Sequence, residues 1–139
     1  VTEFEGTVKD YAGDGVLILV GAPLQFDDHA RRAVALAESI VRCWQDGSQP
    51  LDVGVGVASG RVTVGVVGGA GRLEYAAVGS AVNLASRLCE EARPGEVLVA
   101  GETVAAIDAT GARAGLEPST PRRLKGFADE VATFALRPA

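Results

Sequence analysis

The 139-residue chain contains no methionine, two cysteines and few aromatic residues, which make up 5% of it. Cys43 and Cys89 are too few and too far apart in the sequence for a disulfide framework or a cysteine-based zinc site. Two free thiols are typical of a reducing compartment, so we expect a cytoplasmic location, either for a whole protein or for one domain of a larger protein. Because the initiator methionine is absent and strand-like residues begin almost at once, we expect an N-terminal part to be missing.

The chain also lacks an apolar run long enough to cross a membrane, and it has no long run of lysine and arginine. Its formal net charge is −5. A net negative charge repels nucleic-acid phosphates, which argues against nonspecific nucleic-acid binding. We therefore expect no nucleic-acid partner and no membrane segment in this part of the protein.

What the sequence does contain is an ordinary globular balance of 47% hydrophobic and 22% charged residues, together with 18 glycines. This length predicts one domain, residues 1–139, with a core built from valine, alanine and leucine.

Alternating apolar residues predict several β-strands, and turn residues between them predict hairpins. The first hairpin joins 7–11 to 16–20 through Gly13-Asp14-Gly15, because an Asp-Gly pair between two strand-like runs favours a tight turn. A second hairpin is expected to join 53–57 to 62–66 through Ser59-Gly60. The remaining strands are expected at 74–78, 96–100, 124–127 and 131–136, the last two as a closing hairpin after a loop at 109–120.

Helical spacing of apolar residues predicts a helix from Ala30 to Trp44, with an N-cap from Asp27-Asp28. The lone His29 lies in its first turn, where a surface or capping role is favoured over metal binding. Further helices are expected at 81–92, with Ser80 as the N-cap, and at 102–107. This order of elements predicts an α+β fold, a ferredoxin-like mixed or antiparallel sheet with helices packed on one face.

Two glycines alternate with valines in the predicted strand at 53–57. Glycine weakens a strand unless another group approaches its backbone closely. For Gly54 and Gly56 that group could be a packed helix, a partner subunit or a nucleotide.

Asn83 and Arg87 are four residues apart in a predicted helix, so they share one face. An amide and a guanidinium on one face suit a phosphate that gains negative charge. The same spacing also fits an exposed polar pair on an ordinary amphipathic helix.

Several segments, in order along nearly the whole chain, resemble the class III nucleotidyl cyclase catalytic domain. The most diagnostic is Val82–Leu88, which contains Asn83 and Arg87, and Gly6–Leu17 resembles the metal-binding hairpin of that family. The other similar segments are Asp28–Ala30 with Arg32–Val34, Val53–Val57 with Ser59-Gly60, Tyr75 with Val78-Gly79, Gly95–Val99 and Leu124–Phe127.

This resemblance implies cyclisation of ATP to 3′,5′-cyclic AMP and pyrophosphate, with GTP as the alternative substrate, in a head-to-tail homodimer. Two divalent ions, Mg²⁺ or Mn²⁺, would activate the ribose 3′-oxygen and hold the triphosphate, with Asp14 as one ligand. On the same mapping Arg87 would stabilise charge on the phosphorus, Asn83 would orient the ribose and Lys125 would hold the terminal phosphates. Without the other motifs, Asp14 would be interpreted simply as the aspartate of a tight Asp-Gly turn, and Lys125 could equally be a solvated surface lysine.

The sequence departs from the family in three respects. The family's first metal aspartate precedes everything in this chain, which implies a domain without its first strand and first helices. The base-reading lysine of adenine-selective members is replaced by Asp10, while Lys9 would face the other side of the strand unless the strand bulges. The second base-reading position is Ala76, which offers no side-chain hydrogen bond. Asp10 could accept hydrogen bonds from guanine, so base choice stays open.

These departures leave two alternatives to catalysis. The chain could be a degenerate cyclase domain that dimerises or senses nucleotide without turnover, or an unrelated ferredoxin-like binding module. Intact Asp14, Asn83 and Arg87 favour the enzyme.

Overall fold

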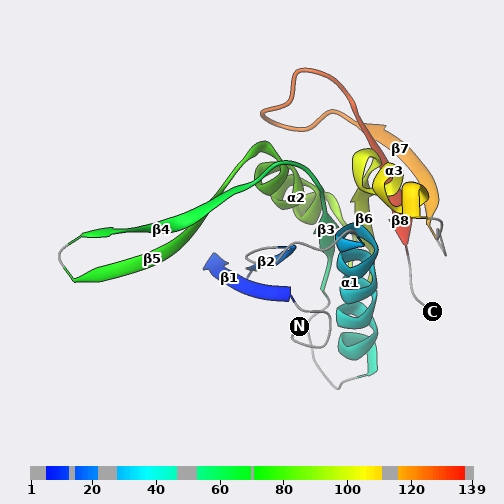
Figure 1. Cartoon of the computed structure of the whole chain (residues 1–139). Coiled ribbons are helices and arrows are strands. Elements are labelled where there is room, and N and C mark those ends of the chain that lie inside the picture. Colours follow the sequence, from blue (N-terminus) through cyan, green and yellow to red (C-terminus); the bar gives the residue numbers. More distant parts are fainter. Residues whose placement is uncertain are drawn as a thin grey trace.

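The computed structural model describes residues 6–12, 15–21, 28–46, 53–69, 71–110 and 116–136 (Figure 1). The predicted α+β class is confirmed. The elements are β1 (Gly6–Ala12), β2 (Gly15–Val20), α1 (His29–Asp46), β3 (Val55–Val57), β4 (Thr63–Gly69), β5 (Arg72–Val78), α2 (Ser80–Glu91), β6 (Val97–Ala100), α3 (Gly101–Thr110), β7 (Glu117–Arg122) and β8 (Val131–Leu136).

A four-stranded mixed sheet holds the core, with strand order β3-β6-β8-β7. β3 runs parallel to β6, and the other two pairs are antiparallel. All four residues of β6 are buried, and alternation along that strand assigns them to two different clusters. Val97 and Val99 pack with α1 and α3, whereas Leu98 and Ala100 pack with α2. The helices therefore cover both faces of the sheet, and the expectation of one covered face was wrong.

The glycines of the β3 segment are explained by α2, the first of the three candidates named above. A Cβ on Gly56 would collide with the backbone of Ala85 and Cys89 and would lie 2.9 Å from the carbonyl carbon of Leu88. A Cβ on Gly54 would lie 3.1 Å from the Cβ of Ala92. A packed helix is thus what approaches this strand so closely, and the missing side chains let α2 lie directly on the sheet.

The first predicted hairpin is confirmed, since β1 and β2 pair antiparallel. The second was wrong. β3 pairs with β6 instead, and β4 pairs with β5 over seven residues, from Thr63↔Val78 to Gly69↔Arg72. Alternating valines predict strands but do not reveal which strand each one pairs with. In Figure 1 the β4–β5 ribbon projects away from the helices as a long arm.

The C-terminal part was only partly predicted. β8 was expected, but its hairpin partner is β7, most of which lies in the expected loop at 109–120, rather than 124–127. β7 contains Pro118 and Pro121, which disfavour a strand in the sequence yet are tolerated because β7 lies at the edge of the sheet. The segment 124–127 forms the connection to β8, with Gly126 at φ +91°.

Candidate functional site

Helix α2 carries the predicted catalytic pair on its outward face. Ala81, Leu84 and Leu88 are buried at helical spacing, and this buried stripe fixes the rotation of the helix about its axis. Asn83 is consequently exposed and Arg87 is 36% exposed. The structure therefore leaves both side chains accessible to a ligand or a second chain.

Gly79, not the expected Ser80, occupies the N-cap position of α2, and no side chain caps this end. The amides of Val82 and Asn83 donate to the carbonyl oxygen of Gly79 at 3.2 and 3.4 Å. A Cβ on Gly79 would lie 2.7 Å from the carbonyl oxygen of Arg61, so glycine is required where β5 enters α2. Backbone contacts alone thus set the start of the helix that bears Asn83.

Arg87 forms an ion pair within its own helix. Its Nη1 atom donates to Oε2 of Glu90 at 3.1 Å and to Oε1 at 3.3 Å, and Glu90 is 62% exposed. The neighbouring Glu91 pairs instead with Arg122 of β7, at 3.3 Å. The last turn of α2 therefore has two adjacent carboxylates with two different partners, and neither was recognised from the sequence.

Lys125 is exposed in the connection between β7 and β8. Its neighbour Leu124 is buried in the same cluster as Leu84 and Leu88, and the amide of Phe127 donates to the carbonyl oxygen of Leu124 at 3.1 Å. This turn is therefore anchored against the buried side of α2, while Lys125 itself points to solvent.

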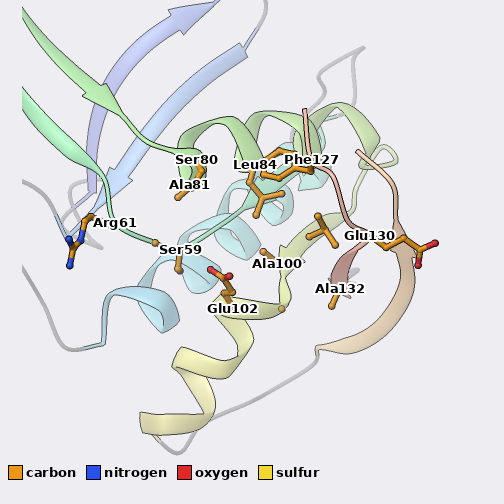
Figure 2. Close-up of a pocket in the computed structure, with 13 residues that line it drawn as sticks. Ser59, Arg61, Ser80, Ala81, Leu84, Ala100, Glu102, Phe127, Glu130 and Ala132 are labelled. Carbon is orange, nitrogen blue, oxygen red and sulfur yellow. The ribbon is translucent and has the colours of Figure 1, made fainter. Parts of the chain in front are cut away.

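A groove of about 440 Å³ lies beside the first turns of α2 (Figure 2). Leu84 of α2 and Phe127 form part of its apolar wall, and Arg61, Glu102 and Glu130 are its charged residues. Asn83, Arg87 and Lys125 do not line it. The groove was not predicted, because its walls come from four segments far apart in the sequence. The complete lining is Ser59, Gly60, Arg61, Ser80, Ala81, Leu84, Ala100, Gly101, Glu102, Phe127, Glu130, Val131 and Ala132.

The two predicted base-reading positions lie on neighbouring strands. Asp10 of β1 is opposite Leu17, and Ala76 of β5 is opposite Gly65. β1 lies against β5, so the fold brings these strands together. The β1–β2 pairing passes from Val8 directly to Asp10, which leaves Lys9 out of the register. The strand thus has the irregularity on which a role for Lys9 depends.

Asp14, the predicted metal ligand, lies outside the described residues. Within the described ranges no group of three or more His, Cys, Asp and Glu side chains could hold a metal ion. A carboxylate is a hard oxygen ligand of the kind that Mg²⁺ prefers, but one carboxylate supplies too few ligands for two ions. Asp14 therefore has suitable ligand chemistry, but the expected two-ion site needs further ligands. Among the described helices, none has the length and apolar character needed to cross a membrane.

Comparison with known sequences gives a match over residues 8–138 to the adenylate and guanylate cyclase catalytic domain. The uncharacterized protein Rv1319c of Mycobacterium tuberculosis H37Rv is 36% identical over 112 residues, which are 79% of this chain and 21% of that protein. The chain spans about a fifth of the length of the curated relatives it matches.

Solved structures agree with the sequence match. The guanylyl cyclase Cya2 has 32% identity and a TM-score of 0.83, covering 99% of this chain and 72% of that chain. The adenylyl cyclase CyaB from P. aeruginosa has 27% identity and a TM-score of 0.77, covering 96% of this chain and 72% of that chain. The similar structures thus include enzymes of both base specificities.

Proposed function

Since the chain belongs to the adenylate and guanylate cyclase catalytic domain family, we propose that it converts ATP into 3′,5′-cyclic AMP and pyrophosphate. The observation that carries this proposal is the outward face of α2, on which Asn83 is exposed and Arg87 is 36% exposed. A phosphate-binding guanidinium must be accessible, and the buried stripe of α2 makes it so.

In the proposed reaction the ribose 3′-oxygen attacks the α-phosphorus in line. The new bond joins O3′ to the α-phosphorus, the bond to the β-phosphate oxygen breaks, pyrophosphate leaves, and the 3′-hydroxyl proton passes to solvent. Divalent ions, when bound, supply charge neutralisation and lower the pKa of the 3′-hydroxyl, with Asp14 as the ligand from this chain. Arg87 donates hydrogen bonds to the oxygens of the transferring phosphorus, Asn83 orients the ribose, and Lys125 pairs with the terminal phosphates.

We further propose that two copies of the chain pair head to tail, so that each active site draws residues from both. Two exposed apolar residues support an interface beside the site. Val78, at the end of β5 where the chain enters α2, is 68% exposed, and Val16 of β2 is 53% exposed. Burial of such side chains favours association.

Base choice depends on β1 and β5. Ala76 contributes no side-chain hydrogen bond, so selectivity is left to Asp10 and to Lys9 at the register irregularity. A carboxylate accepts from the donors at N1 and N2 of guanine, whereas adenine has no donor at N1. GTP is therefore the alternative substrate.

The test is turnover by the chain together with any natural residues that precede Val1, with ATP and GTP offered separately alongside Mn²⁺. Cyclic AMP as the main product supports the proposal, and cyclic GMP as the main product makes Asp10 the base reader. Binding of either nucleotide without product favours a degenerate cyclase domain, to which the atypical Asp10 and Ala76 also point. Absence of nucleotide binding would contradict every nucleotide-dependent role.

Arg87→Ala should reduce turnover by about two to three orders of magnitude. The matched control is Arg42→Ala on α1, because Arg42 is also exposed and paired with a glutamate of its own helix, Glu38. Equal losses in both variants would mean that Arg87 acts through general stability rather than through the reaction.

A further inference from the structure

The carboxylate of Glu90 accepts hydrogen bonds from Arg87, the predicted catalytic arginine. We propose that Glu90 is an internal counter-ion of Arg87 that competes with the substrate phosphate and so raises the KM for nucleotide. The inference rests on the proposed function, because it assigns Glu90 a role at the same site.

The contact is that of a displaceable partner. Both carboxylate oxygens of Glu90 accept from the single atom Nη1 of Arg87, at 3.1 and 3.3 Å. The two parallel hydrogen bonds that make arginine–carboxylate and arginine–phosphate pairs strong need two nitrogens. A phosphate that approaches Nε and Nη2 can form such a pair, so it binds the guanidinium better than Glu90 does.

The exposure of the Glu90 and Arg87 side chains also indicates a displaceable contact. Glu90 is 62% exposed and Arg87 is 36% exposed, so water screens their attraction and the pair contributes little to the stability of the fold. A carboxylate left beside the guanidinium nevertheless repels an incoming triphosphate, which carries several negative charges. The effect of Glu90 on substrate binding should therefore exceed its effect on folding.

The energetics of the helix itself do not favour a carboxylate here. Glu90 and Glu91 occupy the last turn of α2, where the helix dipole is negative, and no basic residue lies in that turn. Glu91 is paired with Arg122 across to β7, whereas Glu90 is paired with the predicted catalytic arginine. The two positions carry the same charge one residue apart, so each is the natural control for the other.

The experiment measures KM and kcat for the preferred nucleotide in five forms: the unaltered chain, Glu90→Gln, Glu91→Gln, Arg87→Ala and the Arg87→Ala, Glu90→Gln double variant. We expect Glu90→Gln to lower KM about threefold with kcat within about twofold. Glu91→Gln should leave KM unchanged. In the Arg87→Ala background, Glu90→Gln should no longer change KM, because the coupling passes through the guanidinium.

Two results would overturn the inference while the proposed function stands. An equal decrease of KM in Glu91→Gln would mean a general charge effect. A decrease of kcat or an increase of KM in Glu90→Gln would mean that Glu90 orients Arg87 rather than competing for it.

If the unaltered chain forms no cyclic nucleotide, the proposed function fails, and the counter-ion is tested by binding instead. Calorimetry then compares the Kd of the Mn²⁺ complex of inorganic tripolyphosphate in the same five forms. A threefold tighter Kd for Glu90→Gln alone, lost in the Arg87→Ala background, supports the inference. An unchanged Kd, or no binding by the unaltered chain, overturns it.

Discussion

The two faces of α2 differ in how they tolerate substitution. The inner face presents Leu84 and Leu88 to the sheet and rests on Gly56, where no side chain fits. The outer face presents Asn83, Arg87 and Glu90 to solvent. On the inner face the shape of each residue decides whether the domain folds, whereas on the outer face its chemistry can change at little cost to the fold.

We therefore expect substitutions on the two faces of α2 to have different effects. Inner-face changes should lower the free energy of unfolding, and they should lower activity only through loss of folded protein. Outer-face changes should lower activity at constant stability. A substitution that lowers both the stability and the activity of the folded protein would contradict this division.

The largest expected effect is that of Gly56→Val on the inner face. Its Cβ would occupy the position of the α2 backbone near Ala85 and Cys89, so the helix must leave the sheet. We expect the free energy of unfolding to fall by more than about 4 kcal/mol, enough to abolish cooperative folding. Urea unfolding followed by circular dichroism measures it.

Gly65→Ala is the control for Gly56→Val, because a Cβ at Gly65 of β4 would meet nothing within 4 Å. Its free energy of unfolding should change by no more than about 0.5 kcal/mol. A well-folded Gly56→Val protein would mean that α2 does not rest on β3 in solution.

The next effect is that of Leu88→Ala. Leu88 is fully buried between α2 and the sheet, and truncation leaves a cavity that a rigid contact cannot close. We expect a loss of about 2–5 kcal/mol in the free energy of unfolding. Thermal unfolding of this variant beside Arg87→Ala compares adjacent residues on opposite faces. A larger stability loss for Arg87→Ala would contradict the division into two faces.

The sequence predicted the helix itself at 81–92, and the glycines of 53–57 indicated that something must approach closely. The buried stripe of Ala81, Leu84 and Leu88 was not identified from the sequence and is a finding of the structure. The pairing of β3 could not be predicted, because alternating valines suit any neighbouring strand and the parallel partner β6 lies about 40 residues further along.

On the outer face, the sequence predicted only residues that are recognised by their spacing along the helix. Asn83 and Arg87 were identified because they lie one turn apart in a family-like segment. The groove could not be, since segments around 59–61, 80–84, 100–102 and 127–132 meet only in the folded chain. Arg87 and Glu90 are three residues apart, a spacing that allows an ion pair on a helix, but this pair was not recognised from the sequence. The metal position Asp14 lies outside the described residues and stays a prediction.

Asn83→Ala tests whether a change on the outer face lowers activity without lowering stability. Asn83 is exposed and its side chain does not cap the helix, so the melting temperature should stay within about 2 °C of the unaltered chain. If it orients the ribose, kcat should fall about 100-fold, since misplacement of a reacting group is costly. Asn83→Asp is the companion variant, and equal activity of all three proteins would remove Asn83 from the site.

The smallest effect concerns an ion pair outside α2, which separates the effect of such a pair on folding from the effect of the Arg87–Glu90 pair on function. At the start of α1, the Arg32 Nε atom donates to Asp28 at 2.9 Å and Arg31 adds a second contact. The hydrogen bond from Arg32 is the main reason why the pKa of Asp28 lies below its ordinary value of 3.8. Because the folded state lowers this pKa, ionised Asp28 stabilises the fold above about pH 3.8, and that contribution is lost as the pH falls through the folded-state value.

Asp28→Asn should therefore lower the melting temperature at pH 7 by no more than about 2 °C, and the difference from the unaltered chain should vanish near pH 2. Cyclase turnover at pH 7 should be unchanged, in contrast to the KM decrease expected for Glu90→Gln. Melting curves at four or five pH values, with Glu38→Gln as a second ion-paired acid for comparison, test this directly. A difference that persists at pH 2 would show that Asp28 acts through its shape rather than its charge. A change in the KM of Asp28→Asn would show that an ion pair outside α2 also influences the site. That result would contradict a specific effect of Glu90 through Arg87.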